Sequence, residues 1–101
     1  MEIRVRFYAL FTEFVPEPEI SIHLPEKSTV QDLIEILNRE LGDKFSREVG
    51  TKIEENQNLQ KLIFIGQYSI KNLEGLATPL QNGDTVKFLP PMEGGSGQVR
   101  R

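Results

Sequence analysis

The fold of this protein is decided by residues 82–95, which read Asn-Gly-Asp-Thr-Val-Lys-Phe-Leu-Pro-Pro-Met-Glu-Gly-Gly. Asn-Gly-Asp at the start of this stretch is a turn signal, because glycine tolerates the positive φ that a tight turn requires. Residues 85–89 predict a last strand in which Val86 and Phe88 face inward. The two prolines stiffen the exit from this strand, and we expect Gly94 and Gly95 beyond them to be flexible.

The rest of the chain predicts the elements that this last strand joins. Polar and apolar residues alternate over residues 2–8 and 19–24, which predicts two strands paired as an antiparallel hairpin. Ser28 or Thr29 caps a helix whose apolar residues recur at three- and four-residue spacing as far as Leu41. Residues 61–65 predict a central strand, and residues 69–70 a short one.

Two segments carry a weaker pattern. Residues 9–15 are mixed and precede Pro16, which predicts a short helical turn and then a loop. Residues 43–60 are mostly polar and predict a short second helix with a loop that crosses the end of the sheet. The order of elements predicts one α+β domain, with a mixed sheet of about five strands and one main helix packed across it. The first and last strands are expected as parallel neighbours in the middle of the sheet.

The composition of the 101 residues excludes several classes of function. A net charge of −3 argues against a general nucleic-acid binder, because neutralising phosphates requires a basic face. The chain has no cysteine, so it has neither disulfides nor a cysteine nucleophile or metal ligand. The apolar run over residues 62–65 is far shorter than the roughly 20 residues of a membrane-spanning helix, and residues 1–4 begin a strand pattern instead of a signal peptide. We therefore expect a cytoplasmic protein without a membrane or nucleic-acid partner.

The pattern as a whole resembles the ubiquitin-like sulfur-carrier family, which has the β-grasp fold. That family includes the small subunit of molybdopterin synthase, the thiamine sulfur carrier and the small archaeal modifier proteins. The resemblance covers residues 1–95 and is carried by residues 4–9, 29–33 and, most specifically, 82–95. It implies a β-grasp domain over residues 1–91 and a reactive Gly-Gly terminus over residues 92–95.

The resemblance also implies the chemistry of that terminus. In the family, the terminal glycine carboxylate attacks the α-phosphate of ATP inside an activating (adenylating) enzyme, and a sulfur donor, a thiol or a lysine amine then displaces AMP. Glycine suits this role because the chain end must enter a narrow channel, and only a residue without Cβ allows such a close approach. The chain itself is then a substrate and carrier, not an enzyme, and binds no cofactor; ATP and zinc are used by its partner enzymes.

This chain departs from the family because six residues, 96–101, follow the second glycine. The Gly95 carbonyl is then peptide-bonded and offers no carboxylate for adenylation. We hypothesise that the chain is a precursor cut between Gly95 and Ser96 by a JAMM-type zinc metalloprotease, which would also act in deconjugation. Loss of Arg100 and Arg101 would change the formal charge from −3 to −5. A cloning remnant, or a natural tail in a paralogue that is never activated, would also explain the extension.

Residues 61–65 are apolar on both faces of the predicted strand, so one pair of side chains points away from the helix. Either Leu62 and Phe64 or Ile63 and Ile65 lie on that second face, beside Leu89. An exposed apolar patch on a small domain predicts a docking surface, and we assign it to Leu62, Phe64, Leu89 and Met92. Burial of the patch under residues 43–60 is the alternative.

No constellation in the sequence supports catalysis by the chain itself. His23 is the only histidine and is predicted to be a surface residue; the carboxylate pairs, such as Glu54 and Glu55, lie in polar segments without a nucleophile nearby. Three functions remain open. The first is a protein modifier joined through Gly95 to target lysines by a conjugating enzyme. The second is a sulfur carrier with a Gly95 thiocarboxylate, which would serve the molybdopterin synthase large subunit. The third is a plain β-grasp binding module.

Overall fold

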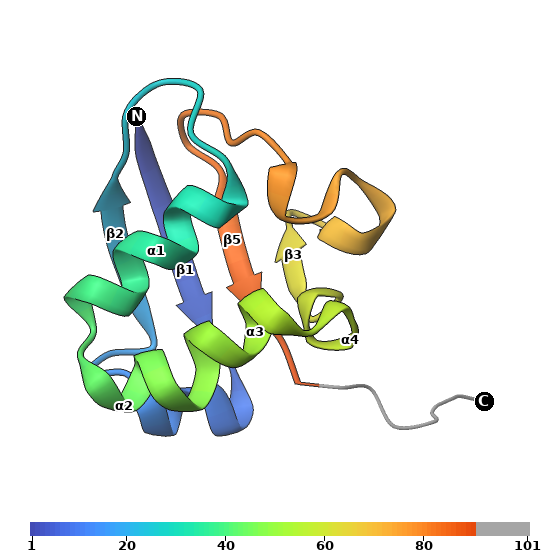
Figure 1. Cartoon of the computed structure of the whole chain (residues 1–101). Helices are drawn as coiled ribbons and strands as arrows, with labels where there is room; N and C mark the ends of the chain where they lie inside the picture. The colour runs from blue at the N-terminus through green and yellow to red at the C-terminus, as the bar shows by residue number, and fades with distance from the viewer. Residues whose placement is uncertain (91–101) are drawn as a thin grey trace.

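Five strands form one mixed sheet in the order β2-β1-β5-β3-β4, and the helices cover one of its faces (Figure 1). The computed structural model describes residues 1–90. β1 pairs with β2 antiparallel and with β5 parallel, while β3 pairs antiparallel with both β5 and β4. The predicted β-grasp arrangement, with the first and last strands parallel in the middle of the sheet, is therefore confirmed. The strands are β1 (Glu2–Phe7), β2 (Glu19–His23), β3 (Ile63–Ile65), β4 (Tyr68–Ser69) and β5 (Thr85–Phe88).

The main helix, α1 (Val30–Glu40), begins and ends where the sequence predicts. Thr29 caps it: the Thr29 hydroxyl accepts a hydrogen bond from the Asp32 backbone N–H, and the Asp32 carboxylate accepts one from the Thr29 N–H. This capping box satisfies two backbone donors that the first turn would leave unpaired. Gly42 follows the C-cap Leu41 with φ +93°, a conformation that glycine adopts without strain.

The other helical elements are short. Residues 43–60 contain more helix than the sequence predicts, because Phe45, Val49 and Ile53 recur every four residues and form one buried face. The polar residues between them hide this periodicity. η1 follows β1 in the chain, and two further short turns, η3 and η4, come between β4 and β5. These elements are η1 (Ala9–Phe14), α2 (Asp43–Phe45), the π-helical η2 (Ser46–Gly50), α3 (Thr51–Glu55), α4 (Gln57–Gln60), η3 (Ile70–Asn72) and η4 (Gly75–Ala77).

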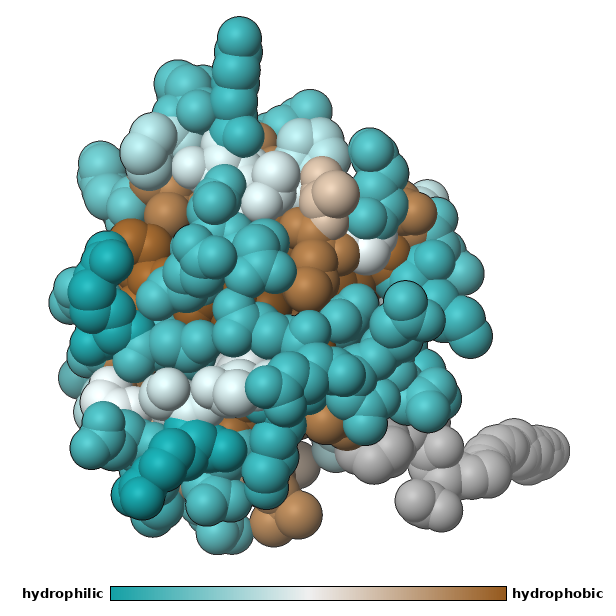
Figure 2. Space-filling view, viewed as in Figure 1, coloured by the Kyte–Doolittle hydropathy of each residue, from teal (hydrophilic) through white to brown (hydrophobic). Residues whose placement is uncertain are grey.

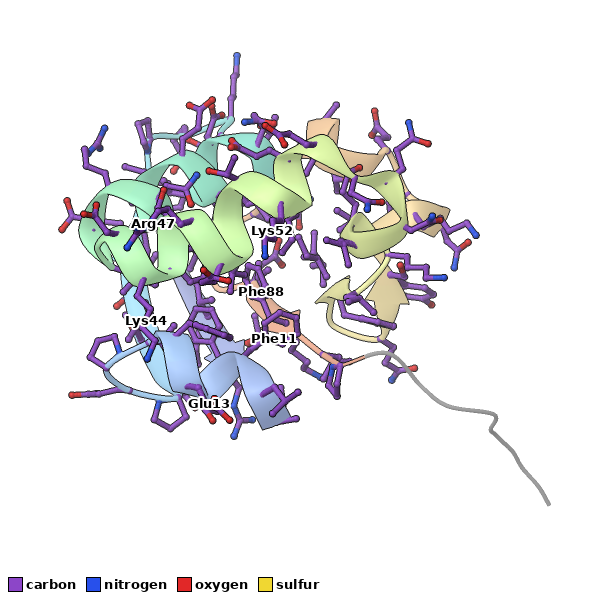
Figure 3. All side chains as sticks on the ribbon, turned by 60° about the horizontal axis from the view of Figure 1, so that its bottom comes forward. Phe11, Glu13, Lys44, Arg47, Lys52 and Phe88 are labelled. Atoms are coloured by element: carbon purple, nitrogen blue, oxygen red, sulfur yellow. The ribbon has the colours of Figure 1, made fainter. Side chains whose placement is uncertain are left out.

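An aromatic cluster fills the core at the end of β1 and β5. Phe7 and Phe88 stack with ring centroids 5.0 Å apart, and Phe45 meets both rings edge-on, at 5.9 and 6.3 Å. Phe11 of η1 closes the cluster from below, 6.0 Å from Phe88 (Figure 3). Such pairs contribute beyond their buried area. The chain therefore leaves β5 directly after one of its best-packed residues.

The described part of the chain leaves several predictions without a test. Within residues 1–90, no helix is both long and apolar enough to cross a membrane. Met92, Gly94, Gly95 and Ser96 lie outside the described residues, as do the predicted domain limits at residues 91 and 95.

Replacing Phe88 should damage the fold severely. We expect Phe88→Ala to lower the free energy of unfolding by about 3–5 kcal/mol, because the cavity would open among three other rings. Leu10→Ala is the control, since Leu10 is 71% exposed and its loss should change stability by at most about 0.5 kcal/mol. Urea denaturation followed by circular dichroism measures both; similar losses in the two variants would contradict the packing described.

Candidate functional site

The register of the sheet decides which side chains of β3 face away from the helices. Ile63 lies opposite Phe88 and Ile65 opposite Val86, so these isoleucines share the helix-covered face with the core of β5. Phe64 therefore points to the open face, between Lys87 of β5 and Ser69 of β4. The sequence left this choice open, and the pairing with β5 resolves it in favour of Phe64.

A groove lies on the open face where the chain leaves β5. We call it the exit groove; its volume is about 620 Å³. Phe64 and Leu89 are half-buried in it, and Leu62, only 8% exposed, supplies part of its wall. Three of the four predicted surface residues thus come together, and the fourth, Met92, lies outside the described residues. The groove is lined by Lys61, Leu62, Phe64, Ser69, Lys71, Asn72, Leu89 and Pro90.

Hydrogen bonds hold the walls of the exit groove in place. The Leu89 N–H donates to the Leu62 carbonyl at 2.9 Å, which extends the pairing of β5 with β3 beyond the strand ends. The buried Ser69 hydroxyl donates to the Lys61 carbonyl at 2.8 Å and accepts from the Lys71 N–H at 3.2 Å. The lining is therefore fixed before any partner binds, which lowers the entropy cost of docking.

The crossover over residues 43–60 does not cover Phe64 and Leu89, whereas Leu62 is buried. Figure 1 shows α2 and α3 on the same side of the sheet as α1. Phe45, Val49 and Ile53 of this crossover belong to the same core cluster as Leu33 and Leu37 of α1. The exit groove consequently faces outward with an apolar lining and two lysines, Lys61 and Lys71, at its edge.

A row of cations, which was not predicted from the sequence, lies on the same open face beside the groove. Arg4, Arg6 and Lys87 form this cationic row: β1 contributes the arginines, and Lys87 lies next to Arg6 across the β1–β5 pair. Glu19 of β2 binds both arginines, with Nε to carboxylate distances of 3.2 and 3.1 Å. The alternation Arg4-Val5-Arg6 could have revealed it, because two arginines flanking a buried valine must share the outer face.

The remaining candidates have structural surroundings. His23 is exposed on β2, as predicted. The Glu54 carboxylate accepts hydrogen bonds from Gln31 at 2.7 Å and from Asn38 at 3.4 Å, which ties α3 to α1. In the described range 1–90, no group of three or more histidine, aspartate or glutamate side chains is arranged to hold a metal ion.

Comparisons with known proteins agree with this geometry. The ThiS family profile matches residues 5–95 of the chain and ends at Gly95. Small archaeal modifier protein 3 of Haloferax volcanii is 30% identical over 96 residues, which cover 94% of this chain and 100% of that protein.

Solved structures share the fold. The crystal structure of SAMP1 from Haloferax volcanii superposes with a TM-score of 0.73 at 17% identity, covering 94% of this chain and 100% of that one. Subunits 1 and 2 of the molybdopterin-converting factor from Helicobacter pylori were solved as a complex. A chain of that complex matches with a TM-score of 0.60 at 23% identity, covering 94% of this chain and 100% of its own.

The assignment of the two faces can be tested by placing a charge on each. We expect Ile63→Asp to cost at least about 4 kcal/mol of unfolding free energy, because the carboxylate would enter a core position that is 0% exposed. Leu89→Asp on the open face should cost about 1 kcal/mol. Chemical denaturation of the two variants beside the wild type gives both values, and equal losses would be evidence against an outward-facing groove.

Proposed function

Because this chain belongs to the ThiS family, we propose that it is the precursor of a ubiquitin-like protein modifier that acts through Gly95. A protease cuts after Gly95, a ubiquitin-activating-type enzyme adenylates the new carboxylate, and a conjugating enzyme joins it to lysines of target proteins. The observation that carries this proposal is the identity of 30% with Small archaeal modifier protein 3 over that protein's whole length. Members of this family of small carriers are generally not enzymes themselves.

Each proposed step has a defined chemistry. Hydrolysis of the Gly95–Ser96 bond consumes one water and gives a Gly95 carboxylate and the peptide of residues 96–101. The carboxylate oxygen then attacks the α-phosphorus of ATP, and pyrophosphate leaves. A lysine Nε attacks the resulting acyl adenylate, AMP leaves, and the amine proton passes to solvent. A JAMM-type zinc metalloprotease is the class of enzyme we propose for the cut and for deconjugation. The reactions are expected in the cytoplasm.

The exit groove is the part of the described structure that we assign to this function. It adjoins Pro90, five residues before Gly95, so a partner docked there holds the segment that carries the reactive end. Its apolar lining suits the centre of a protein interface, where aromatic and aliphatic side chains fill pockets. We propose that the activating enzyme docks on the exit groove while it adenylates Gly95.

A sulfur carrier is the second candidate, and the likeness to the molybdopterin-converting factor favours it. In this version a persulfide on a partner cysteine displaces AMP from Gly95, and a thiol then reduces the acyl disulfide. A Gly95 thiocarboxylate remains, and the two partner thiols become a disulfide. The partner at the exit groove would then include a molybdopterin synthase large subunit. A plain β-grasp binding module, in which Gly94 and Gly95 have no chemical role, remains the third candidate.

The mass of the protein recovered from its own cells tests the proposal. The protein should end at Gly95 and be accompanied by lysine-linked conjugates, detected after tryptic digestion as modified lysines. A species ending at Gly95 in which sulfur replaces one oxygen, trapped with a thiol reagent and without conjugates, would make it a sulfur carrier. An intact Arg101 end in active cells would contradict both versions.

Docking at the exit groove has its own test. The substitution Leu89→Asp is made in protein that ends at Gly95. It should lower the rate of ATP–pyrophosphate exchange by the activating enzyme at least about tenfold, because the new carboxylate would lose its hydration in an apolar interface. Tyr68→Asp is the matched control: it adds the same charge at a 64% exposed side chain outside the groove lining. Unimpaired exchange by the Leu89 variant would remove the groove from the mechanism.

A further inference from the structure

The cationic row of Arg4, Arg6 and Lys87 has no role in the proposed chemistry. It runs from the Glu19 carboxylate across β1 and β5 to Phe64 in the exit groove, since Arg6 lies opposite Lys87 and Lys87 opposite Phe64. Like charges on neighbouring strands repel and weaken a sheet. The Arg6–Lys87 pair therefore works against the stability of the sheet, and its presence calls for another explanation.

One carboxylate neutralises only part of this charge. Glu19 forms ion pairs with both Arg4 and Arg6. All three side chains are about half exposed: 44% for Glu19, 60% for Arg4 and 48% for Arg6. Among residues 1–90, the ion pairs involve other cations and not Lys87, Lys61 or Lys71. The cations thus lie on two sides of the apolar lining; Lys61 and Lys71 are exposed, and Lys87 is half-buried.

The chain as a whole is acidic, and a set of its carboxylates lies on the helix-covered side, while the open face carries Glu2 and Glu19 beside its cations. The helix-covered face is mainly hydrophilic (Figure 2), and α1, α2, η2 and α3 present a set of exposed carboxylates there. Lys44, Arg47 and Lys52 lie on the same helical run (Figure 3), and together with the exposed Arg39 in the last turn of α1 they offset only part of that negative charge. The carboxylates are Asp32, Glu35, Glu40, Asp43, Glu48 and Glu55.

We infer that the enzyme surface which docks on the exit groove is acidic, with carboxylates that face the cationic row while an apolar side chain fills the groove. This inference rests on the proposed function and adds the chemistry of the partner. Opposite charges around an apolar centre speed encounter and fix orientation more than they add affinity. The net negative helical face of this chain would meanwhile repel the same partner, which favours docking on the open face.

A charge reversal in the row tests this inference. The probe is the activating enzyme from the same cells, assayed by ATP–pyrophosphate exchange with protein ending at Gly95. Lys87→Glu should raise the KM for this protein about tenfold at a salt concentration of about 0.05 M, with kcat unchanged. At about 0.5 M salt, where the Debye length is about 4 Å and longer-range attraction is screened, the KM values of variant and wild type should agree within about twofold.

Arg47→Glu is the matched control. It makes the same change in net charge at an exposed position of η2 on the helical side, and should leave the KM within about twofold of wild type. Equal effects of the two reversals would mean that only net charge matters and would overturn the inference, as would a Lys87 variant indistinguishable from wild type. If the wild type binds a short RNA, and Lys87→Glu abolishes this binding while Arg47→Glu does not, the cationic row would be a nucleic-acid site instead. If the wild type itself supports no exchange, the proposed function fails, and this inference fails with it.

Discussion

The parallel pairing of β1 with β5 is the contact on which the rest of this structure depends. Parallel neighbours cannot be joined by a tight turn, so the chain between them must cross over the sheet, and here α1 and the helices after it do so. The crossover covers one face and leaves the other open. The same pair stacks Phe7 on Phe88 and puts the exit of the chain next to β3, where the groove lies.

Much of this arrangement could be predicted from the sequence because its local signals agree with one another. Alternation defined the strands around Val5 and Ile22, and the Thr29 capping box marked the start of α1. Residues 43–60 were underpredicted, since three buried side chains at four-residue spacing are hard to see among polar neighbours. The outward side of β3 was assigned to Leu62 and Phe64 without a decisive signal, because both faces are apolar and only the register with β5 distinguishes Phe64 from Ile63.

The candidate site was predicted in part for the same reason. Leu62, Phe64 and Leu89 were expected on one surface, and they line one groove. The cationic row was missed because its members come from strands distant in the sequence, Lys87 lying beside Arg6 only once β1 and β5 have paired. The two proposed functions, protein modifier and sulfur carrier, would use the same described residues. They differ in the nucleophile that a partner brings to Gly95, which is a property of the partner.

The central place of β5 also has a meaning for protein synthesis. The ribosome makes β5 last among the strands, and until it appears β1 lacks its parallel neighbour and β3 has only β4 beside it. Long-range pairing of this kind forms late in folding. A nascent chain, or one released early, therefore has neither a complete sheet nor Leu89 to shape the groove. Because Gly94 and Gly95 are translated after β5, every chain that contains these glycines also contains all the residues of the folded domain.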